Sequence, residues 1–163
     1  MSEIKQKAQA LNEYLVATRR HFHENPESSL KEYDTAAYIQ KELTAFGIPF
    51  EKVAETGTLA IIKGGKGEGE TVLLRADIDA LELPDCTGKP YASKRPGLNH
   101  ACGHDAHTTM GLGTARVLNE LKDSFAGTVL IAFQPAEEIG AGAKQFVASG
   151  KIDNIDESFA IHV

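Results

Sequence analysis

TVLLRAD (residues 71–77) begins as a continuous apolar run of strand length, and GTVLIAF (residues 127–133) repeats that pattern further along the chain. Such runs are typical of strands that are buried on both faces of a sheet. A helix is predicted between them, over about residues 105–122. Because strands that alternate with helices are typical of helix-covered parallel sheets, the expected fold is an α/β domain with a mostly parallel or mixed sheet flanked by helices.

The segments on either side of these two runs fit the same architecture. Apolar residues at helical spacing predict a helix over residues 3–24, which the pair Asn25-Pro26 ends, and Gly47 ends the next predicted helix. The further expected elements are helices over about 33–46 and 140–149, strands around 50–54, 58–63 and 158–163, and a long loop over 84–104.

The composition is that of a globular protein. Hydrophobic residues make up 42% of the 163 positions and charged residues 25%, which argues against disorder. The net charge of −6 argues against nucleic acid or an anionic membrane surface as a partner, since both favour basic patches. No apolar run in the sequence approaches the roughly 20 residues that cross a bilayer.

The N-terminal stretch MSEIKQKAQALNEYL is charged and amphipathic, without the apolar core or cleavage site of a secretory signal. The expected location is therefore the cytoplasm. The two cysteines, Cys86 and Cys102, make no disulfide framework. In a reducing compartment, a cysteine beside histidines is a candidate metal ligand or nucleophile.

Polar residues that could carry chemistry follow three of the predicted strands. In an α/β sheet the ligand site lies beyond the carboxyl ends of the strands. The residues at these positions are Asp77 and Asp79 after the first strand, Glu137 and Glu138 after the second, and His162 at the end of the last. We therefore expect these side chains to meet at one edge of one sheet.

The stretch NHACGHDAH (residues 99–107) leads into a predicted helix at the same edge. Cys102 and His104 are separated by one glycine, so their side chains can converge on one ion if the backbone there is extended. A thiolate and an imidazole suit zinc and other first-row metals. The same residues allow a second interpretation, in which Cys102 is the nucleophile of a cysteine hydrolase and His104 or His107 is its base.

The neighbouring residues allow more than one role. Asp105 is either the N-cap of the helix or, together with His107, a residue that supports a metal ligand. His100 has no assigned role. In RRHFHENPE (residues 19–27), Arg19, His21 and His23 have no clear chemical role and are interpreted as a charged helix end.

The carboxylates also have competing interpretations. Glu137 and Glu138 are either a solvated helix start or a pair in which one binds a metal while the other takes a proton from a metal-activated water. Asp77 and Asp79 lie two residues apart, on the same side of an extended backbone. They are either surface turn acids or carboxylates that orient a metal-bound histidine or the catalytic water.

In this order, the segments resemble the N-acyl-amino-acid amidohydrolases, a hippurate-hydrolase-like and auxin-conjugate-hydrolase-like branch of the dinuclear aminoacylase and carboxypeptidase metallohydrolases. The resemblance spans nearly the whole chain. It implies part of a catalytic domain of metallo-aminopeptidase-like fold, which cleaves the amide bond of N-acyl amino acids through a metal-activated water. The segments that carry it are RRHFHENPE (19–27), LLRADIDAL (73–81), GKPYASKRPGLNHACGHDAHTTMGLG (88–113), GTVLIAFQPAEEIGAGAKQ (127–145) and FAIHV (159–163).

The resemblance also implies a role for each site residue. It makes Glu137 the general base, which takes a proton from the water and later gives it to the leaving amine. It places a catalytic-site aspartate in RADID, with Asp77 favoured and Asp79 in support. Two divalent metal ions, of Mn²⁺, Zn²⁺, Co²⁺ or Ni²⁺, are implied, and the ligands carried over for them are Cys102, His104, Glu138 and His162.

Members of this family are longer than the present sequence. Residues 1–163 are therefore expected to be the N-terminal part of the catalytic metallohydrolase domain, without the lid or dimerisation domain, the rest of the catalytic domain and a final histidine ligand. Reduced or no activity is expected of this chain alone. The expected partner is a small N-acyl amino acid, such as an N-acetyl or benzoyl derivative, and full-length relatives are expected to be homo-oligomers. The alternatives are an inactive metal-binding remnant and a subunit of a split enzyme.

Overall fold

The computed structural model describes residues 3–163, which form a mixed five-stranded sheet with helices on both faces. The helices are α1 (Glu3–Ala10), α2 (Asn12–Glu24), α3 (Tyr33–Ala45), α4 (His104–Glu120) and α5 (Gly142–Ala148), with the 3-10 turn η1 (Lys122–Ser124). The strands are β1 (Phe50–Val53), β2 (Gly57–Lys63), β3 (Thr71–Asp77), β4 (Thr128–Gln134) and β5 (Glu157–Ala160).

The sheet has the strand order β1-β2-β4-β3-β5. Strand β3 pairs in parallel with both β4 and β5, while β2 pairs antiparallel with β1 and β4. The apolar runs at residues 71–77 and 127–133 are therefore neighbouring strands, with Ala76 opposite Phe133. The predicted α/β architecture with a mixed, helix-flanked sheet is confirmed.

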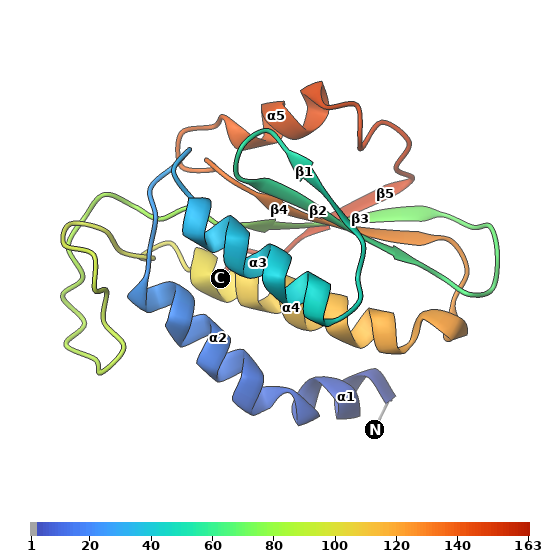
Figure 1. The fold of residues 1–163 in the computed structure, drawn as a ribbon, viewed down its shortest axis with the longest axis horizontal. Coiled ribbons are helices and arrows are strands. Elements are labelled where there is room, and N and C mark those ends of the chain that lie inside the picture. Colours follow the sequence, from blue (N-terminus) through green and yellow to red (C-terminus); the bar gives the residue numbers. More distant parts are fainter. Residues whose placement is uncertain (1–2) are drawn as a thin grey trace.

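Both faces of the central strands are buried, as the continuous apolar runs predict. Along β4, Ile131 and Phe133 point into the core under α3 and α4, whereas Leu130 and Ala132 pack on the opposite face with Phe146 of α5. Figure 1 shows α3 and α4 on one side of the sheet, α5 on the other, and α1 and α2 as an outer layer against α4.

Helix α4 lies close to the sheet because a glycine faces it. A Cβ atom at Gly111 would lie 2.8 Å from the ring of Phe133 and 3.2 Å from Ala76. Any side chain at this position would push the helix away from β3 and β4. The close approach matters for function, because the first turn of α4 carries His104 and His107.

Two predicted elements differ from the observed ones. The predicted helix over residues 3–24 is broken at Leu11, which is 8% exposed and donates its N–H to Ala8 rather than continuing the helical pattern. The bend lets α1 pack against α4, where Lys7 bonds Glu120. The predicted last strand also stops at Ala160, because its pairing with β3 ends opposite Arg75.

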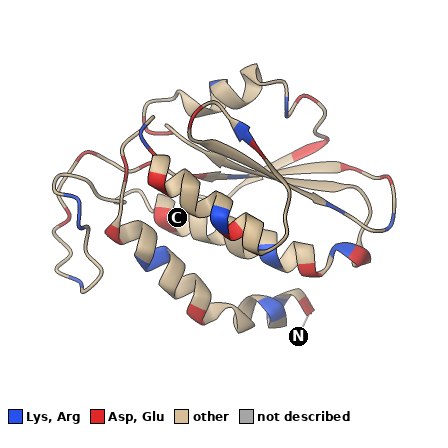
Figure 2. Ribbon diagram, viewed as in Figure 1, with Lys and Arg blue, Asp and Glu red and all other residues tan. Residues whose placement is uncertain are grey.

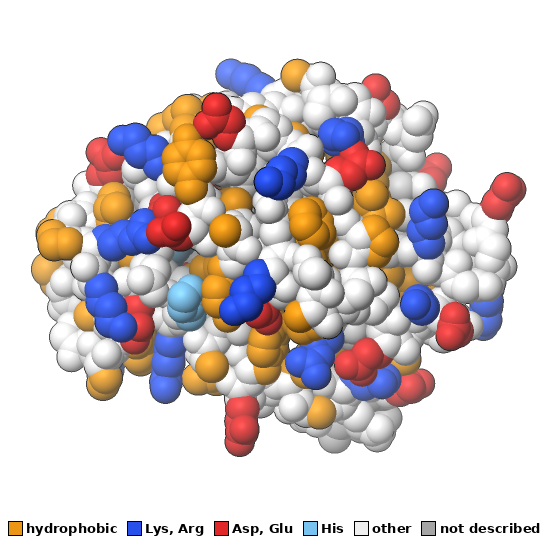
Figure 3. Space-filling view, viewed as in Figure 1, with side chains coloured by type: hydrophobic (Ala, Val, Ile, Leu, Met, Phe, Trp, Pro, Cys, Tyr) orange, Lys and Arg blue, Asp and Glu red, His pale blue; other side chains and the backbone are white. Residues whose placement is uncertain are grey.

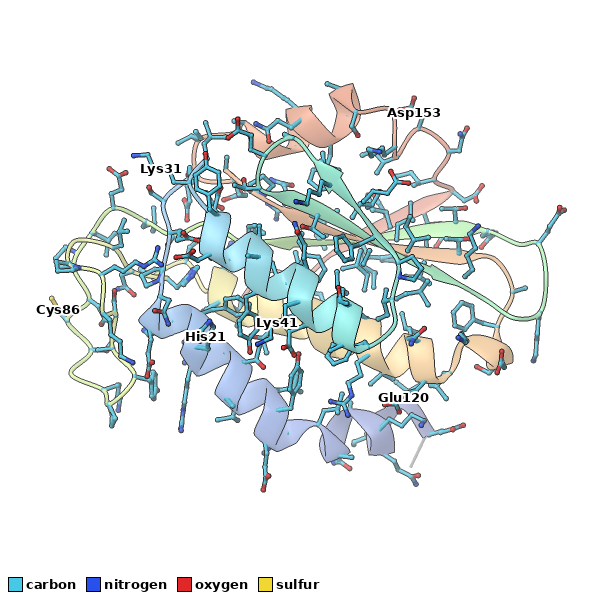
Figure 4. All side chains as sticks on the ribbon, viewed as in Figure 1. His21, Lys31, Lys41, Cys86, Glu120 and Asp153 are labelled. Atoms are coloured by element: carbon cyan, nitrogen blue, oxygen red, sulfur yellow. The ribbon has the colours of Figure 1, made fainter. Side chains whose placement is uncertain are left out.

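The surface carries charges of both signs. Figures 2 and 3 show Lys and Arg interspersed with Asp and Glu over the viewed face, without a broad patch of one sign. Within residues 3–163, none of the helices combines the length and apolarity that crossing a membrane requires. Both cysteines are free thiols, and Cys86 lies on the long loop at the edge of the molecule (Figure 4).

Candidate metal centre

The carboxyl ends of β3, β4 and β5 meet at one edge of the sheet, because the three strands are parallel to each other. The chain after β3 leads to α4 on one face, and the chain after β4 leads to α5 on the other face. Neighbouring strands whose connections leave in opposite directions open a crevice where ligands bind in α/β proteins. The site residues predicted from the sequence end or follow β3, β4 and β5 at this edge, or lie in the segment that begins α4.

His104 is the centre of the cluster. Its ring is fully buried, and Nδ1 lies 2.9 Å from the backbone oxygen of Asp79 and 3.3 Å from Oδ1 of the same residue. Since a carbonyl oxygen only accepts, Nδ1 donates, and in the neutral ring Nε2 carries the lone pair. Nε2 lies 3.6 Å from Oδ1 of Asp77 and 3.8 Å from the nearest oxygens of Glu137 and Glu138, and it has no hydrogen-bond partner among residues 3–163.

The carboxylates shift the ionisation of this histidine. Burial disfavours the imidazolium, but the bond to Asp79 and the charges of Asp77 and Asp79 outweigh it and raise the pKa of His104. Burial also disfavours the charged form of Asp79, yet the bonds from His104, Ser29 and the Glu138 amide lower the pKa of its carboxyl. The two aspartates therefore face one ring, Asp79 at Nδ1 and Asp77 at Nε2, which excludes the interpretation as surface turn acids.

Cys102 and His162 complete the cluster from two other segments. Sγ of Cys102 lies 3.4 Å from Nε2 of His162, and together with a ring nitrogen of His104 these ligand atoms lie within 4.8 Å of one another. The backbone between Cys102 and His104 is not extended as expected. Gly103 adopts φ 83°, a left-handed turn that brings the two side chains together and that glycine tolerates without strain.

The environment of Cys102 argues against the cysteine-hydrolase interpretation. Burial and the charges of Glu138 and Glu137 raise the pKa of the thiol to about 11. A nucleophilic cysteine requires the opposite shift, toward a thiolate at neutral pH. A bound cation reverses this electrostatic balance, because it stabilises a coordinating thiolate directly.

The two glutamates differ in exposure and are held by a tight turn. The side chain of Glu138 is 19% exposed and that of Glu137 is 34% exposed. Ala136 has φ 51°, and its N–H donates to the buried carboxylate of Glu32 over 2.8 Å. The N–H of Glu138 donates to Oδ2 of Asp79 over 3.1 Å. Glu32 could not be predicted as a supporting residue, since its partner Ala136 lies more than a hundred residues away in the chain.

Arg75 is a second residue that sequence reasoning missed, although it belongs to the RADID motif. Its Nη1 lies 2.7 Å from Oδ2 of Asp77, and its Nη2 lies 3.6 Å from Oε1 of Glu137. The guanidinium also donates through Nε to Gln134 over 3.0 Å. Arg75 thus joins β3, β4 and the turn after β4, and neutralises part of the negative charge of the cluster.

The interpretation of RRHFHENPE as a charged helix end is wrong for two of its residues. His23 is 5% exposed, and its Nδ1 lies 2.7 Å from Oδ2 of Asp105. Arg19 reaches the same oxygen through Nε at 2.7 Å. Asp105 is therefore a buried acceptor within the first turn of α4, whereas the N-cap position is occupied by Gly103 without a side-chain cap bond. The interpretation holds for His21, which is exposed and stacks on Tyr38 between α2 and α3.

His100 stays outside the cluster. It is 3% exposed, and neither ring nitrogen has a hydrogen-bond partner within the described residues. Burial lowers the pKa of His100 to about 4, so the ring is neutral near pH 7. The structure gives it no part in the contacts among the site residues.

The cluster fits a divalent cation. A buried ring nitrogen of His104 and a buried oxygen of Glu138 face each other unpaired at 3.8 Å, an arrangement that costs free energy unless a shared partner satisfies both. Thiolate, imidazole and carboxylate are the donors that zinc and related metals use. The groups whose ligand atoms lie close enough to hold an ion are Cys102, His104 and His162; His104, Glu137 and Glu138; and Asp77, His104 and His107.

Comparison with known proteins agrees with this geometry. The family model of peptidase family M20/M25/M40 matches residues 73–163, which include every residue of the cluster. The chain belongs to peptidase family M20/M25/M40. The sequence-based assignment to the dinuclear aminoacylase and carboxypeptidase metallohydrolases is thereby confirmed.

Individual members of the family support the assignment. N-acetyl-L-cysteine deacetylase of Bacillus subtilis is 47% identical over 93% of this chain and 36% of its own length. The IAA-amino acid hydrolase ILR1-like 5 of Arabidopsis thaliana is 44% identical over 93% of the chain and 34% of its own length. A crystal structure of a dinuclear metal-binding peptidase of family M20 from Bacillus subtilis superposes with a TM-score of 0.91 at 41% identity, over 94% of this chain and 44% of that one. The chain thus spans 34% to 44% of the length of these relatives.

Proposed function

We propose that this chain carries the metal-binding and proton-transferring part of a metal-dependent amidohydrolase that cleaves the amide bond of N-acyl amino acids. The observation that carries the proposal is the convergence of Cys102, His104 and His162, from three separate segments, to within 4.8 Å of one another. The relatives named for N-acetyl-L-cysteine and for indole-acetyl amino acids support an N-acyl amino acid as the substrate class.

Two divalent ions are proposed, as in the dinuclear relative. Their proposed ligands are the thiolate, imidazole and carboxylate groups of Cys102, His104, Glu138 and His162. When bound, such ions lower the pKa of a water and polarise the substrate carbonyl. Asp79 holds the His104 ring with Nδ1 as the donor, so that Nε2 is available as a ligand atom.

Glu137 is proposed as the residue that moves the proton. It is the more exposed of the two glutamates; its Oε2 lies 3.8 Å from His104 Nε2, and its Oε1 lies 3.6 Å from Nη2 of Arg75. A carboxylate in this position takes a proton from the attacking water and then protonates the leaving amine, as amide hydrolysis requires. The fully buried Asp77 and its ion-pair partner Arg75 lie beside Glu137, and their charges set the electrostatic potential at its carboxylate.

The experiment is a titration of the metal-free chain with Co²⁺ and with Zn²⁺, followed calorimetrically and by the Co²⁺ absorption spectrum. We expect stoichiometric binding with a thiolate-to-cobalt absorption band. Cys102→Ser should abolish that band, whereas Cys86→Ser, at the exposed cysteine of the long loop, should leave it unchanged. Absence of binding by the native chain, or a band that depends on Cys86, contradicts the proposal.

Catalysis is tested with N-acetyl-L-cysteine, N-acetyl-L-methionine and hippurate as substrates, on the full-length protein that contains this chain. We expect activity that is lost to a chelator and restored by Mn²⁺, Co²⁺ or Zn²⁺. Glu137→Gln should lower kcat by roughly 10²–10⁴-fold while metal binding is retained, since general acid–base groups contribute about that much. Activity that is insensitive to chelation and abolished by thiol alkylation contradicts the metal mechanism and favours the cysteine hydrolase.

A further inference from the structure

His107 lies buried between β3 and the segment after β5, and both of its ring nitrogens are occupied. Nδ1 lies 2.5 Å from Oδ1 of Asp77, and Nε2 lies 3.0 Å from the backbone nitrogen of Val163. A backbone N–H only donates, so Nε2 accepts and carries no proton. The proton of the neutral ring therefore sits on Nδ1 and is donated to Asp77, which fixes the tautomer.

The acceptor at the other end of this ring is itself held in place. Asp77 is fully buried at the end of β3, and its second oxygen lies 2.7 Å from Nη1 of Arg75. Arg75 in turn donates to the side chain of Gln134 at the end of β4. A continuous series of polar contacts thus runs from β4 through β3 and His107 to the backbone of Val163.

The segment that receives this contact carries His162. Pairing of β5 with β3 ends at Ala160, and the side chains of Ile161 and Val163 are 68% and 67% exposed. The centroids of the His107 and His162 rings lie 4.8 Å apart, and the angle between the ring planes is 65°. Fixing the peptide that joins His162 to Val163 limits the directions in which the His162 ring can point, because it restrains the backbone dihedral that follows the His162 Cα atom.

We propose that His107 is a positioning residue: in its Nδ1-protonated tautomer it ties the segment after β5 to Asp77, and so aims His162 at Cys102. The proposal rests on the proposed function only in that it takes His162 as a metal ligand. It assigns His107 no contact with the ion or the substrate.

The buried trio Asp77, His104 and His107 is the competing interpretation, since its ligand atoms are close enough to hold an ion. That role requires a free ring nitrogen on His107. Nδ1 is used by Asp77 and Nε2 by Val163, so neither lone pair nor open direction remains for an ion. Positioning is the role that agrees with both contacts.

The tautomer is tested by ¹⁵N NMR of the histidine rings in the metal-free chain, with His107→Gln used to assign the signals. We expect a protonated Nδ1 and an unprotonated Nε2 for His107. A ring with the proton on Nε2, or one that exchanges between both tautomers, overturns the proposal. This measurement involves no metal, so it stands whether or not the proposed function survives.

A matched pair of variants tests the positioning. His107→Gln places an amide oxygen near the Nε2 position, where it still accepts from Val163, whereas His107→Asn keeps only a donor toward Asp77. We expect His107→Asn to weaken Co²⁺ binding by roughly tenfold or more, as loss of a residue that supports a metal ligand does. His107→Gln should lose clearly less and keep the thiolate-to-cobalt band.

Equal losses in the two folded variants, or a larger loss in His107→Gln, overturn the proposal, because neither follows from the bond to Val163. Folding of each variant is checked by circular dichroism before the titration. If the native chain binds no Co²⁺, the proposed function fails, and the NMR measurement alone decides the tautomer and its role in placing Val163.

Discussion

His104 and His162 belong to the same cluster, with ring centroids 5.9 Å apart, but are held by the fold in very different ways. His104 lies fully buried in the first turn of α4, with its ring bonded to Asp79. His162 follows an edge strand whose four residues are all exposed, and it lies in an exposed segment beyond the last paired residue. One histidine is fixed by the core, and the other by a contact between its neighbour Val163 and His107.

This difference shows that the fold holds one side of the candidate site more firmly than the other. The His104 side is anchored by packing and by Asp105, which draws the start of α4 toward α2 through His23 and Arg19. The His162 side is held by the bond of Val163 to His107 and the contact of His162 with Cys102, and the strand that precedes it is exposed. Substitutions on the first side should therefore act on stability, and those on the second side should act on metal binding with little effect on stability.

The largest effect is expected for Asp105→Ala. Asp105 is fully buried and accepts from both His23 and Arg19, so its loss leaves two polar side chains without their partner. Loss of a buried acceptor that two side chains share leaves their donors without this partner, at a cost of about 3 kcal/mol. The measurement is the free energy of unfolding in urea, with Glu120→Ala at the exposed Lys7 pair as the control, where a change below about 1 kcal/mol is expected. Equal effects in the two variants would show that the bonds of Asp105 do not anchor the His104 side.

The sequence predicted much of this fold because strand patterns are local. The apolar runs at 71–77 and 127–133 read as buried strands, and the rule for carboxyl ends placed Asp77 and Glu137 at one edge. The contact of Arg19 with Asp105 has no local signal, since two segments far apart in the chain meet only after α2 packs on α4.

The hydrogen-bond networks inside the site could not be predicted from the sequence either. The spacing of Cys102 and His104 suggested convergence, but not the left-handed turn at Gly103 that produces it. The tautomers of His104 and His107 follow from which backbone groups they meet, Asp79 O and Val163 N. Such partners depend on three-dimensional packing to a fraction of an ångström, which residue spacing does not encode.

The next largest effect on the free energy of unfolding is expected for His104→Ala, and His162→Ala is the variant to compare with it. Loss of the buried ring of His104 leaves a cavity and removes the donor to Asp79, at a cost of about 2 kcal/mol in the metal-free chain. His162→Ala at an exposed position should change stability by less than about 0.5 kcal/mol. Both variants should lose Co²⁺ affinity. A destabilisation by His162→Ala as large as that by His104→Ala would show that the segment after β5 is part of the core.

Gly103→Ala should lower both the free energy of unfolding and the Co²⁺ affinity slightly. A Cβ atom there would lie 2.7 Å from Cγ2 of Val163, and the φ of 83° is unfavourable for alanine by about 1–2 kcal/mol. Gly67→Ala is the matched control, because Gly67 has φ 93° with no atom within 4 Å of the added Cβ. We expect similar losses of unfolding free energy in the two variants, and weaker Co²⁺ binding only in Gly103→Ala. Unchanged Co²⁺ affinity in Gly103→Ala would show that metal binding does not depend on the position of Val163.

The smallest effect is expected for Asp85→Asn, in the loop that reaches the His104 side, where Asp85 lies 3.3 Å from His23. The N–H groups of Ser93 and Thr87 lower the pKa of Asp85 from 3.8 to about 2. A carboxyl with a lowered pKa in the folded state stabilises that state above its unfolded pKa, and the gain is lost as the pH falls. The stability advantage of the native chain over Asp85→Asn should thus be complete above about pH 5 and decline between pH 4 and 2, as measured by urea unfolding at each pH. An advantage that does not vary over this range means that the loop bonds do not depend on the charge of Asp85, and the anchoring of the His104 side then rests on Asp105 and packing alone.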